Sequence, residues 1–181
     1  MNFFTVGDSH SWHGWMKIPG INTRSIGPMT MYRAGLQKPN VVGHIPNDGV
    51  VIFCWGEIDC RCHVHEHQPW AECIDEIVKN YAEMVRANAW THPNAWIYNV
   101  VPPPRRDGQS EGHGNFPFLG TNEDRLNYVL YMNERLKKTG IPFIDVYAKY
   151  SDAEGYLNPT VSDDQVHVSN EKPLIEWMNS I

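Results

Sequence analysis

A serine and a histidine near opposite ends of this sequence are spaced to carry nucleophilic catalysis. Ser9 follows Gly7 and Asp8 directly after the short apolar run 2–6. A serine at such a strand-to-helix turn is exposed, and the free N–H groups at a helix start stabilise an anion. A nucleophilic serine needs this placement. The alternative interpretation is that Ser9 only caps the following helix.

The base that such a serine requires is found near the other end of the chain. His167 follows Asp164 by three residues in a polar segment. This spacing lets the carboxylate hold one imidazole nitrogen while the other nitrogen faces the serine. Alone the segment also fits a surface loop, but together with Ser9 it predicts a Ser-Asp-His triad in a chain order that is known for such sites.

Apolar runs separated by amphipathic stretches predict the elements that position these residues. Helical periodicity covers residues 69–90 and residues 122–139, where Asn122 is the expected N-cap and Gly140 the stop. Five mostly continuous apolar runs fit strands covered on both faces: residues 2–6, 23–26, 49–55, 95–101 and 142–146. This alternation predicts one α/β domain, a sandwich around about five parallel strands with ligands at their carboxyl ends.

The order of these motifs resembles the SGNH hydrolases, also called GDSL esterases. The counterparts of the family's motifs are residues 7–9 (GDS), Gly27, residues 56–59 (GEID) and residues 164–167 (DQVH). The resemblance covers nearly the whole chain, so we expect one such domain over residues 1–181. It implies a single domain with a flavodoxin-like three-layer α/β/α sandwich, no metal and no other cofactor.

The resemblance also implies a role for each matched residue. Ser9 would attack the substrate, His167 would act as the base, and Asp164 would orient the imidazole. The backbone N–H groups of Ser9 and Gly27 would help form the oxyanion hole.

One position departs from the family pattern. The asparagine that would donate to the oxyanion falls at Ile58, which has no donor. A missing donor of this kind costs about 3 kcal/mol of transition-state stabilisation. Arg61 is a candidate replacement, although it equally fits a structural ion pair with Glu57. We therefore expect Gly27, Arg61, Glu57 and Asp59 to serve oxyanion stabilisation and substrate binding.

Residues 60–67 (CRCHVHEH) contain side chains of the types that bind metals. A structural zinc site usually has a second, distant pair of ligands, and the sequence offers none convincingly. We expect this segment to be a polar loop at the rim of the pocket, without a metal.

The segment 102–120 is a long stretch that is rich in glycine and proline. Such loops in compact domains are usually functional, so this one is a candidate lid or acyl-group wall. Arg105 and Arg106 within it either contact an anionic substrate or lie in solvent, and solvent is the favoured reading.

Charge and cysteine usage narrow the class of protein. The chain has 15 Lys and Arg against 21 Asp and Glu, for a net charge of −6, which argues against a nucleic-acid partner. It lacks an apolar stretch of about 18 residues and a signal-peptide pattern, so we expect no membrane partner. The four clustered cysteines indicate reduced thiols and a cytoplasmic protein: Cys54, Cys60, Cys62 and Cys73.

These observations together predict a serine esterase that hydrolyses small, acetyl-type esters through an acyl-enzyme. Its partner would be a small-molecule ester or an acylated carbohydrate, since the sequence shows no broad apolar lid for long lipids. The alternatives are an acyltransferase of the same fold and a non-catalytic module that binds a glycan or polar ligand, which Ile58 motivates. No prediction of the oligomeric state follows.

Overall fold

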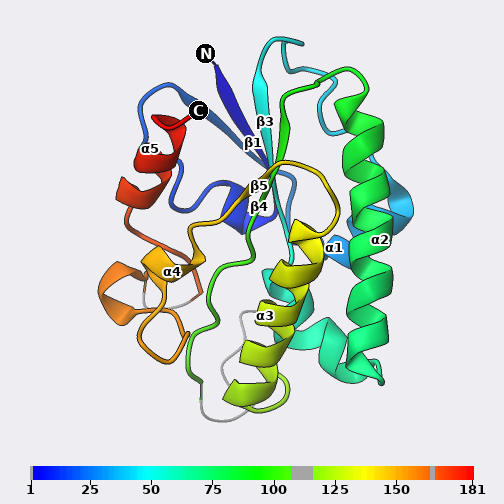
Figure 1. Cartoon of the computed structure of the whole chain (residues 1–181), viewed down its shortest axis with the longest axis vertical. Coiled ribbons are helices and arrows are strands. Elements are labelled where there is room, and N and C mark those ends of the chain that lie inside the picture. Colours follow the sequence, from blue (N-terminus) through cyan, green and yellow to red (C-terminus); the bar gives the residue numbers. More distant parts are fainter. Residues whose placement is uncertain (1, 107–115, 164–165) are drawn as a thin grey trace.

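Five parallel strands form the central sheet in the order β2-β1-β3-β4-β5 (Figure 1). The computed structural model describes residues 2–106, 116–163 and 166–181. All neighbouring strands pair in parallel. Their bounds are Phe3–Gly7 (β1), Ile21–Ser25 (β2), Val50–Cys54 (β3), Ala95–Tyr98 (β4) and Phe143–Ile144 (β5).

Helices cover both faces of this sheet, which confirms the predicted three-layer α/β/α class (Figure 1). One face carries α1 (Met31–Gln37), α2 (Trp70–Ala89) and α3 (Asn122–Lys137). The other carries α4 (Tyr147–Tyr150) and α5 (Lys172–Met178). Four shorter turns complete the fold: the 3₁₀ helix η1 (Ser9–Ser11), the π-helical turn η2 (Asp59–His63) and the 3₁₀ helices η3 (Val64–Glu66) and η4 (Pro159–Val161).

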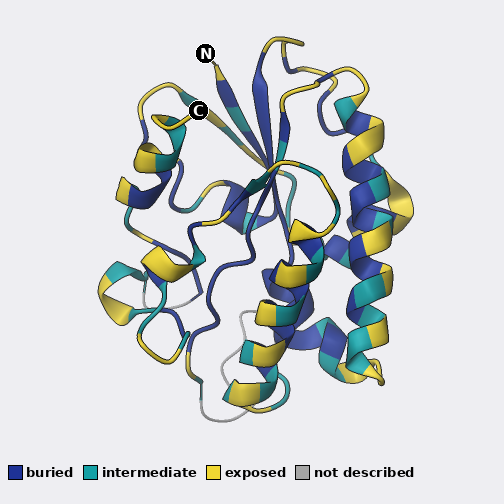
Figure 2. Cartoon of the chain, viewed as in Figure 1, coloured by how far each residue is buried: buried dark blue, intermediate teal, exposed yellow. Residues whose placement is uncertain are grey.

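Alternate side chains of the central strands pack into two cores, one on each face of the sheet. Val51 and Phe53 of β3 join the core beneath α1, α2 and α3. Val50 and Ile52 of the same strand join the opposite core, together with Trp15. Figure 2 shows the buried strands between helices whose outer faces are exposed. Burial on both faces explains why the strand segments are continuous apolar runs.

The predicted strands and long helices are present, but some ends differ. The β2 strand begins at Ile21, before the predicted segment, and β4 ends at Tyr98. The N-cap of α3 is Thr121 rather than Asn122. Thr121 Oγ1 accepts from the Asp124 N–H at 3.0 Å, while the Asp124 carboxylate accepts from the Thr121 N–H at 2.9 Å. This reciprocal capping box satisfies two donors at the helix start, which a lone cap at Asn122 would not do.

All four cysteines are free thiols, and three of them are buried. Within the described part of the chain, every helix is too short or too polar to cross a bilayer.

Candidate active site

The end of β1 places Ser9 at the carboxyl edge of the sheet. Gly7 lies so close to β3 that an added Cβ would be 1.9 Å from the carbonyl oxygen of Cys54, so no larger residue fits there. The Asp8 N–H donates to that same carbonyl at 3.2 Å. The Asp8 side chain caps η1 by accepting from the His10 N–H at 2.8 Å. Because Asp8 is the cap, the half-buried hydroxyl of Ser9 is left for other partners.

The structure brings Ser9 and His167 together although 158 positions separate them. Ser9 Oγ lies 2.9 Å from Nε2 of His167. On the far side of the ring, Nδ1 of His167 lies 2.7 Å from a carboxylate oxygen of Asp163. Such a chain of hydroxyl, imidazole and carboxylate has the geometry of an activated nucleophile.

The carboxylate on His167 belongs to Asp163 and not to the expected Asp164, which lies outside the described residues. The reason is the backbone pairing on either side of that position. Ser162 and Val168 form an antiparallel bridge, so the residues just inside it face each other. The Asp163 N–H donates to the His167 carbonyl and the His167 N–H donates to Asp163 Oδ1, both at 3.0 Å. Asp163 thus holds both the backbone and the ring of His167.

Several neighbours of His167 favour its neutral form. Burial is the largest cause, followed by the nearby imidazole of His10, and together they lower the pKa of His167 to about 4 against the opposing effect of Asp163. His13 contributes in the same direction and stacks on the His167 ring, with centroids 3.7 Å apart and planes 14° from parallel. A neutral imidazole is the form that accepts a proton from a serine.

This pKa predicts that any activity that uses His167 as its base extends into unusually acidic solution. The acid limb of kcat/KM reports the free-enzyme base, so we expect it near pH 4 rather than near the 6.5 of an ordinary histidine. A His13→Ala variant uncovers one face of the His167 ring and removes a nearby imidazole. The acid limb of its kcat/KM profile should therefore move to higher pH. The measurement is a pH–rate profile for both proteins.

Folding must be checked across the same pH range. Because the pKa of His167 is lower in the folded than in the unfolded chain, the unfolded state binds this proton more readily. The stability linked to His167 is therefore lost as the pH falls from 6.5 through about 4. Circular dichroism separates this unfolding from titration of the base, and a wild-type limb at or above 6.5 would contradict the assignment.

Two of the predicted substrate-binding residues, Glu57 and Arg61, form a buried charge cluster beside His167. Glu57 Oε1 lies 3.3 Å from Arg61 Nε, and Glu57 Oε2 lies 3.7 Å from His10 Nε2. Burial opposes ionisation of Glu57, but Arg61 and then His10 lower the pKa of this carboxyl. Glu57 and Asp8 conversely raise the pKa of His10 against its burial. The ion pair that the sequence left as an alternative for Arg61 is thus present, and the guanidinium is almost fully buried.

Asp59, also expected to bind substrate, is fully buried and anchors α1 instead. Its carboxylate accepts from the backbone N–H groups of Met31 at 2.6 Å and Tyr32 at 3.0 Å. Burial raises the pKa of Asp59 to about 7, and these two N–H groups oppose the rise. With both oxygens so occupied, Asp59 fixes the segment after β2 rather than contacting a ligand.

Removing the Asp59 carboxylate is therefore expected to destabilise the fold. Asp59→Ala leaves the buried N–H of Met31 without a partner, which costs about 1–3 kcal/mol, and the part-buried N–H of Tyr32, which costs less because water reaches it. We expect a total loss of about 2–4 kcal/mol in urea-induced unfolding. The control is Asp48→Ala at an exposed position, which should change stability by less than about 0.5 kcal/mol. Equal stability of the two variants would show that Asp59 does not anchor α1.

The two backbone donors assigned to the oxyanion hole lie on adjacent strand ends. Ser25, two residues before Gly27, pairs in register with Gly7, two residues before Ser9. Gly27 has a φ of +94°, in the left-handed region that favours glycine, and open space lies where its Cβ would be. Among the described residues, no acceptor takes the N–H of Ser9, whereas the N–H of Gly27 donates to Ser25 Oγ over a long 3.4 Å. Ile58, at the position of the family's asparagine, is buried and adds no donor.

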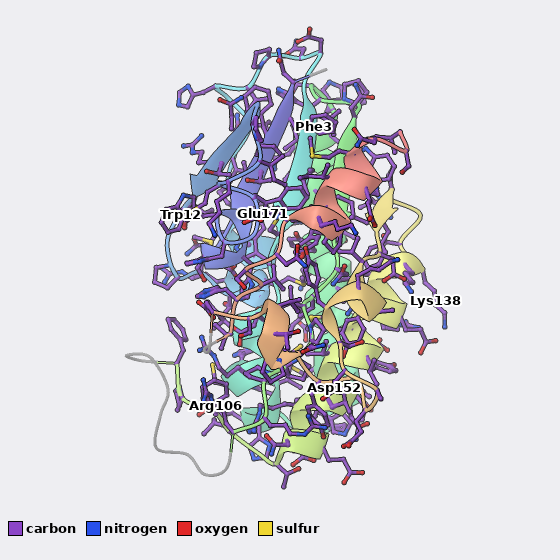
Figure 3. All side chains as sticks on the ribbon, turned by 90° about the vertical axis from the view of Figure 1, so that its left-hand side faces the viewer. Phe3, Trp12, Arg106, Lys138, Asp152 and Glu171 are labelled. Carbon is purple, nitrogen blue, oxygen red and sulfur yellow. The ribbon has the colours of Figure 1, made fainter. Side chains whose placement is uncertain are left out.

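The structure also locates the other residues that the sequence singled out. Arg105 is exposed and binds the carboxylates of Asp152 and Glu154 at 2.5 and 2.7 Å, which agrees with a surface role. Figure 3 shows Asp152 in the lower half of the molecule, toward which the strands run. Of the candidate lid, residues 107–115 lie outside the described residues.

The sequence did not predict His10 and His13 as neighbours of His167, although they follow Ser9 by only one and four residues.

Comparison with known proteins supports the fold at low sequence identity. No family model matches the sequence, and no curated protein matches it. A GDSL-like lipase from Bacteroides thetaiotaomicron is 19% identical with a TM-score of 0.68, over 99% of this chain and 86% of the other. An acetyl xylan esterase is 15% identical with a TM-score of 0.63 over all of both chains. An aryl esterase from M. smegmatis is 14% identical with a TM-score of 0.64 over 99% of both. The chain therefore has the fold that the resemblance to GDSL esterases implied.

Proposed function

We propose that this chain, which shares the fold of GDSL-type hydrolases, is a serine esterase with Ser9 as nucleophile, His167 as base and Asp163 as its orienting carboxylate. The observation that carries the proposal is the contact of 2.9 Å between Ser9 Oγ and His167 Nε2, with Asp163 bound behind the ring. A hydroxyl in contact with a neutral, oriented imidazole is the arrangement that acyl transfer requires.

The mechanism follows from these contacts. Nε2 of His167 takes the proton of Ser9 as Oγ attacks the ester carbonyl, and the N–H groups of Ser9 and Gly27 stabilise the resulting oxyanion. The imidazolium then protonates the leaving alcohol, which departs and leaves an acyl-Ser9 ester. Water, deprotonated by His167, hydrolyses this ester and regenerates the hydroxyl. Asp163 keeps the proton on Nδ1 throughout.

The proposed substrates are small, acetyl-type esters, including those carried by carbohydrates. One neighbour in fold is an acetyl xylan esterase, which supports acetyl esters of carbohydrates, and another is an aryl esterase, which supports ester hydrolysis in general. The alternatives are an acyltransferase, in which an acceptor alcohol replaces water, and a binding module without turnover. The binding module is an alternative because Ile58 replaces the asparagine that donates to the oxyanion in the family.

A fluorophosphonate probe tests the nucleophile without knowledge of the substrate. We expect the probe to label wild-type protein at Ser9, as mapped by mass spectrometry of peptides. His167→Ala should abolish labelling, whereas Ser180→Ala at an exposed position should not change it. Labelling elsewhere, or equal labelling in His167→Ala, would contradict the triad. Added acceptor alcohols that yield new esters would separate transfer from hydrolysis.

A further inference from the structure

Three side chains with metal-binding atoms gather on elements that carry no part of the triad. His63 ends η2, His67 follows η3, and Cys73 lies in the first turn of α2. One donor atom from each lies within 4.8 Å of the other two. The triad residues are instead Ser9 in η1 and, near the C-terminus, Asp163 and His167, so the cluster is a separate feature.

The helical turns after β3 bring the rings of two histidines together. His63 and His67 are four residues apart, so they share one side of the helical turn, and their ring centroids are 4.2 Å apart. Tyr32 stacks on the outer face of His63, with centroids 4.5 Å apart, and limits its rotation. A π-helical turn such as η2 is rare and is often found at functional sites.

One histidine of the cluster has a fixed tautomer. Nδ1 of His67 lies 2.8 Å from the carbonyl oxygen of His63. A carbonyl only accepts, so Nδ1 carries the proton and Nε2 keeps its lone pair. Histidines that bind metals usually donate their other ring N–H to a carbonyl or carboxylate in this way, which fixes the tautomer.

The surroundings favour a cation. The three ligand residues line an open cavity of about 240 Å³, which Glu72 and Glu76 also line. His67 is exposed and Cys73 half-buried, so an ion reaches them from solvent and both side chains can turn toward it. Tetrahedral bonds of about 2.1 Å to nitrogen and 2.3 Å to sulfur need the three donors to close by about 1 Å from their widest separation.

We propose that His63, His67 and Cys73 bind a zinc ion, with water as the fourth ligand. Two imidazoles and one thiolate form a mixed set of the borderline softness that zinc prefers. On binding, the Cys73 thiol releases its proton to solvent and a zinc–sulfur bond forms, with no change of oxidation state. The ion would join the segment after β3 to the start of α2.

This inference differs from the expectation that the chain binds no metal. The sequence pairs Cys60 and Cys62 with the histidines of the same segment, yet both thiols are buried away from them. Cys73 is the ligand that completes the set, and in the sequence it is only one apolar position of a predicted helix. Only the packing of α2 against η3 shows it to be a neighbour of the two histidines.

The experiment uses the 181-residue chain with the substitution His167→Ala, because His13, Asp163 and His167 form another group of possible ligands in the described chain. Titration with Zn²⁺ by calorimetry should give one ion per chain at micromolar or lower free metal, and should raise the Tm. Co²⁺ should give the thiolate charge-transfer absorption of a cysteine-ligated ion. Because the background lacks the catalytic base, failure here says nothing about esterase activity.

Single substitutions in this background locate the ion. Cys73→Ser should remove the thiolate absorption, and His67→Ala should weaken zinc binding at least about 10-fold. His65→Ala is the matched control, because its Nδ1 contacts Tyr128 instead of the cluster. Circular dichroism checks that each variant folds. Because His67 is exposed, His67→Ala is the variant that should disturb core packing least. Absence of binding at micromolar zinc, or binding that neither variant weakens, would overturn the proposal.

Discussion

Replacing Ser9 with alanine is expected to lower kcat/KM for p-nitrophenyl acetate at least about 10³-fold, because the acyl-enzyme then cannot form. The hydroxyl is the only part removed, and its partner at 2.9 Å is the His167 ring rather than the core. The fold should therefore remain, with a Tm close to that of wild type. Steady-state kinetics and thermal unfolding of both proteins measure these effects.

The control for Ser9→Ala is Ser180→Ala, which changes an exposed serine near the C-terminus. It should hydrolyse the ester at the wild-type rate. If Ser9→Ala is as active as this control, Ser9 is not the nucleophile and any turnover comes from another group. If neither the variant nor the wild type turns over any ester, while a glycan or polar ligand binds both, the non-catalytic module is favoured.

Replacing Asp163 with asparagine is expected to lower kcat by about 10³–10⁴-fold. The carboxylate lies 2.7 Å from His167 Nδ1 and holds the tautomer in which Nε2 accepts the Ser9 proton. An amide can present its N–H to Nδ1 instead, which places the proton on the wrong nitrogen. Since substrate contacts are unchanged, we expect the loss in kcat rather than in KM.

The matched control is Asp164→Asn, the next residue in the sequence, which should stay within a few-fold of wild type. The reverse result, with Asp164→Asn inactive and Asp163→Asn active, would assign the orienting role to Asp164, as the family resemblance implied. Combining Ser9→Ala with Asp163→Asn should cost little more than Ser9→Ala alone, because the members of a triad act as a unit.

Much of this architecture could be predicted from local patterns. The continuous apolar runs predicted the strands because both faces of a parallel sheet are covered, as Val51 and Ile52 show by packing into opposite cores. The abrupt change from an apolar run to Gly7 and Ser9 predicted a polar group at the carboxyl edge. Gly7 itself is explained by the approach of the Cys54 carbonyl, which no pattern within β1 reveals.

What could not be predicted is which side chains face one another across distant segments. Asp163 and Asp164 are the same residue type at adjacent positions, and only the bridge between Ser162 and Val168 turns Asp163 toward His167. Asp59 stands in a motif of the site, yet the start of α1 takes both of its oxygens. Residue type and spacing decide which helices and strands form, because these depend on neighbours in the chain. Partners of a carboxylate or a thiol depend on directions in space, which are set only when the elements pack.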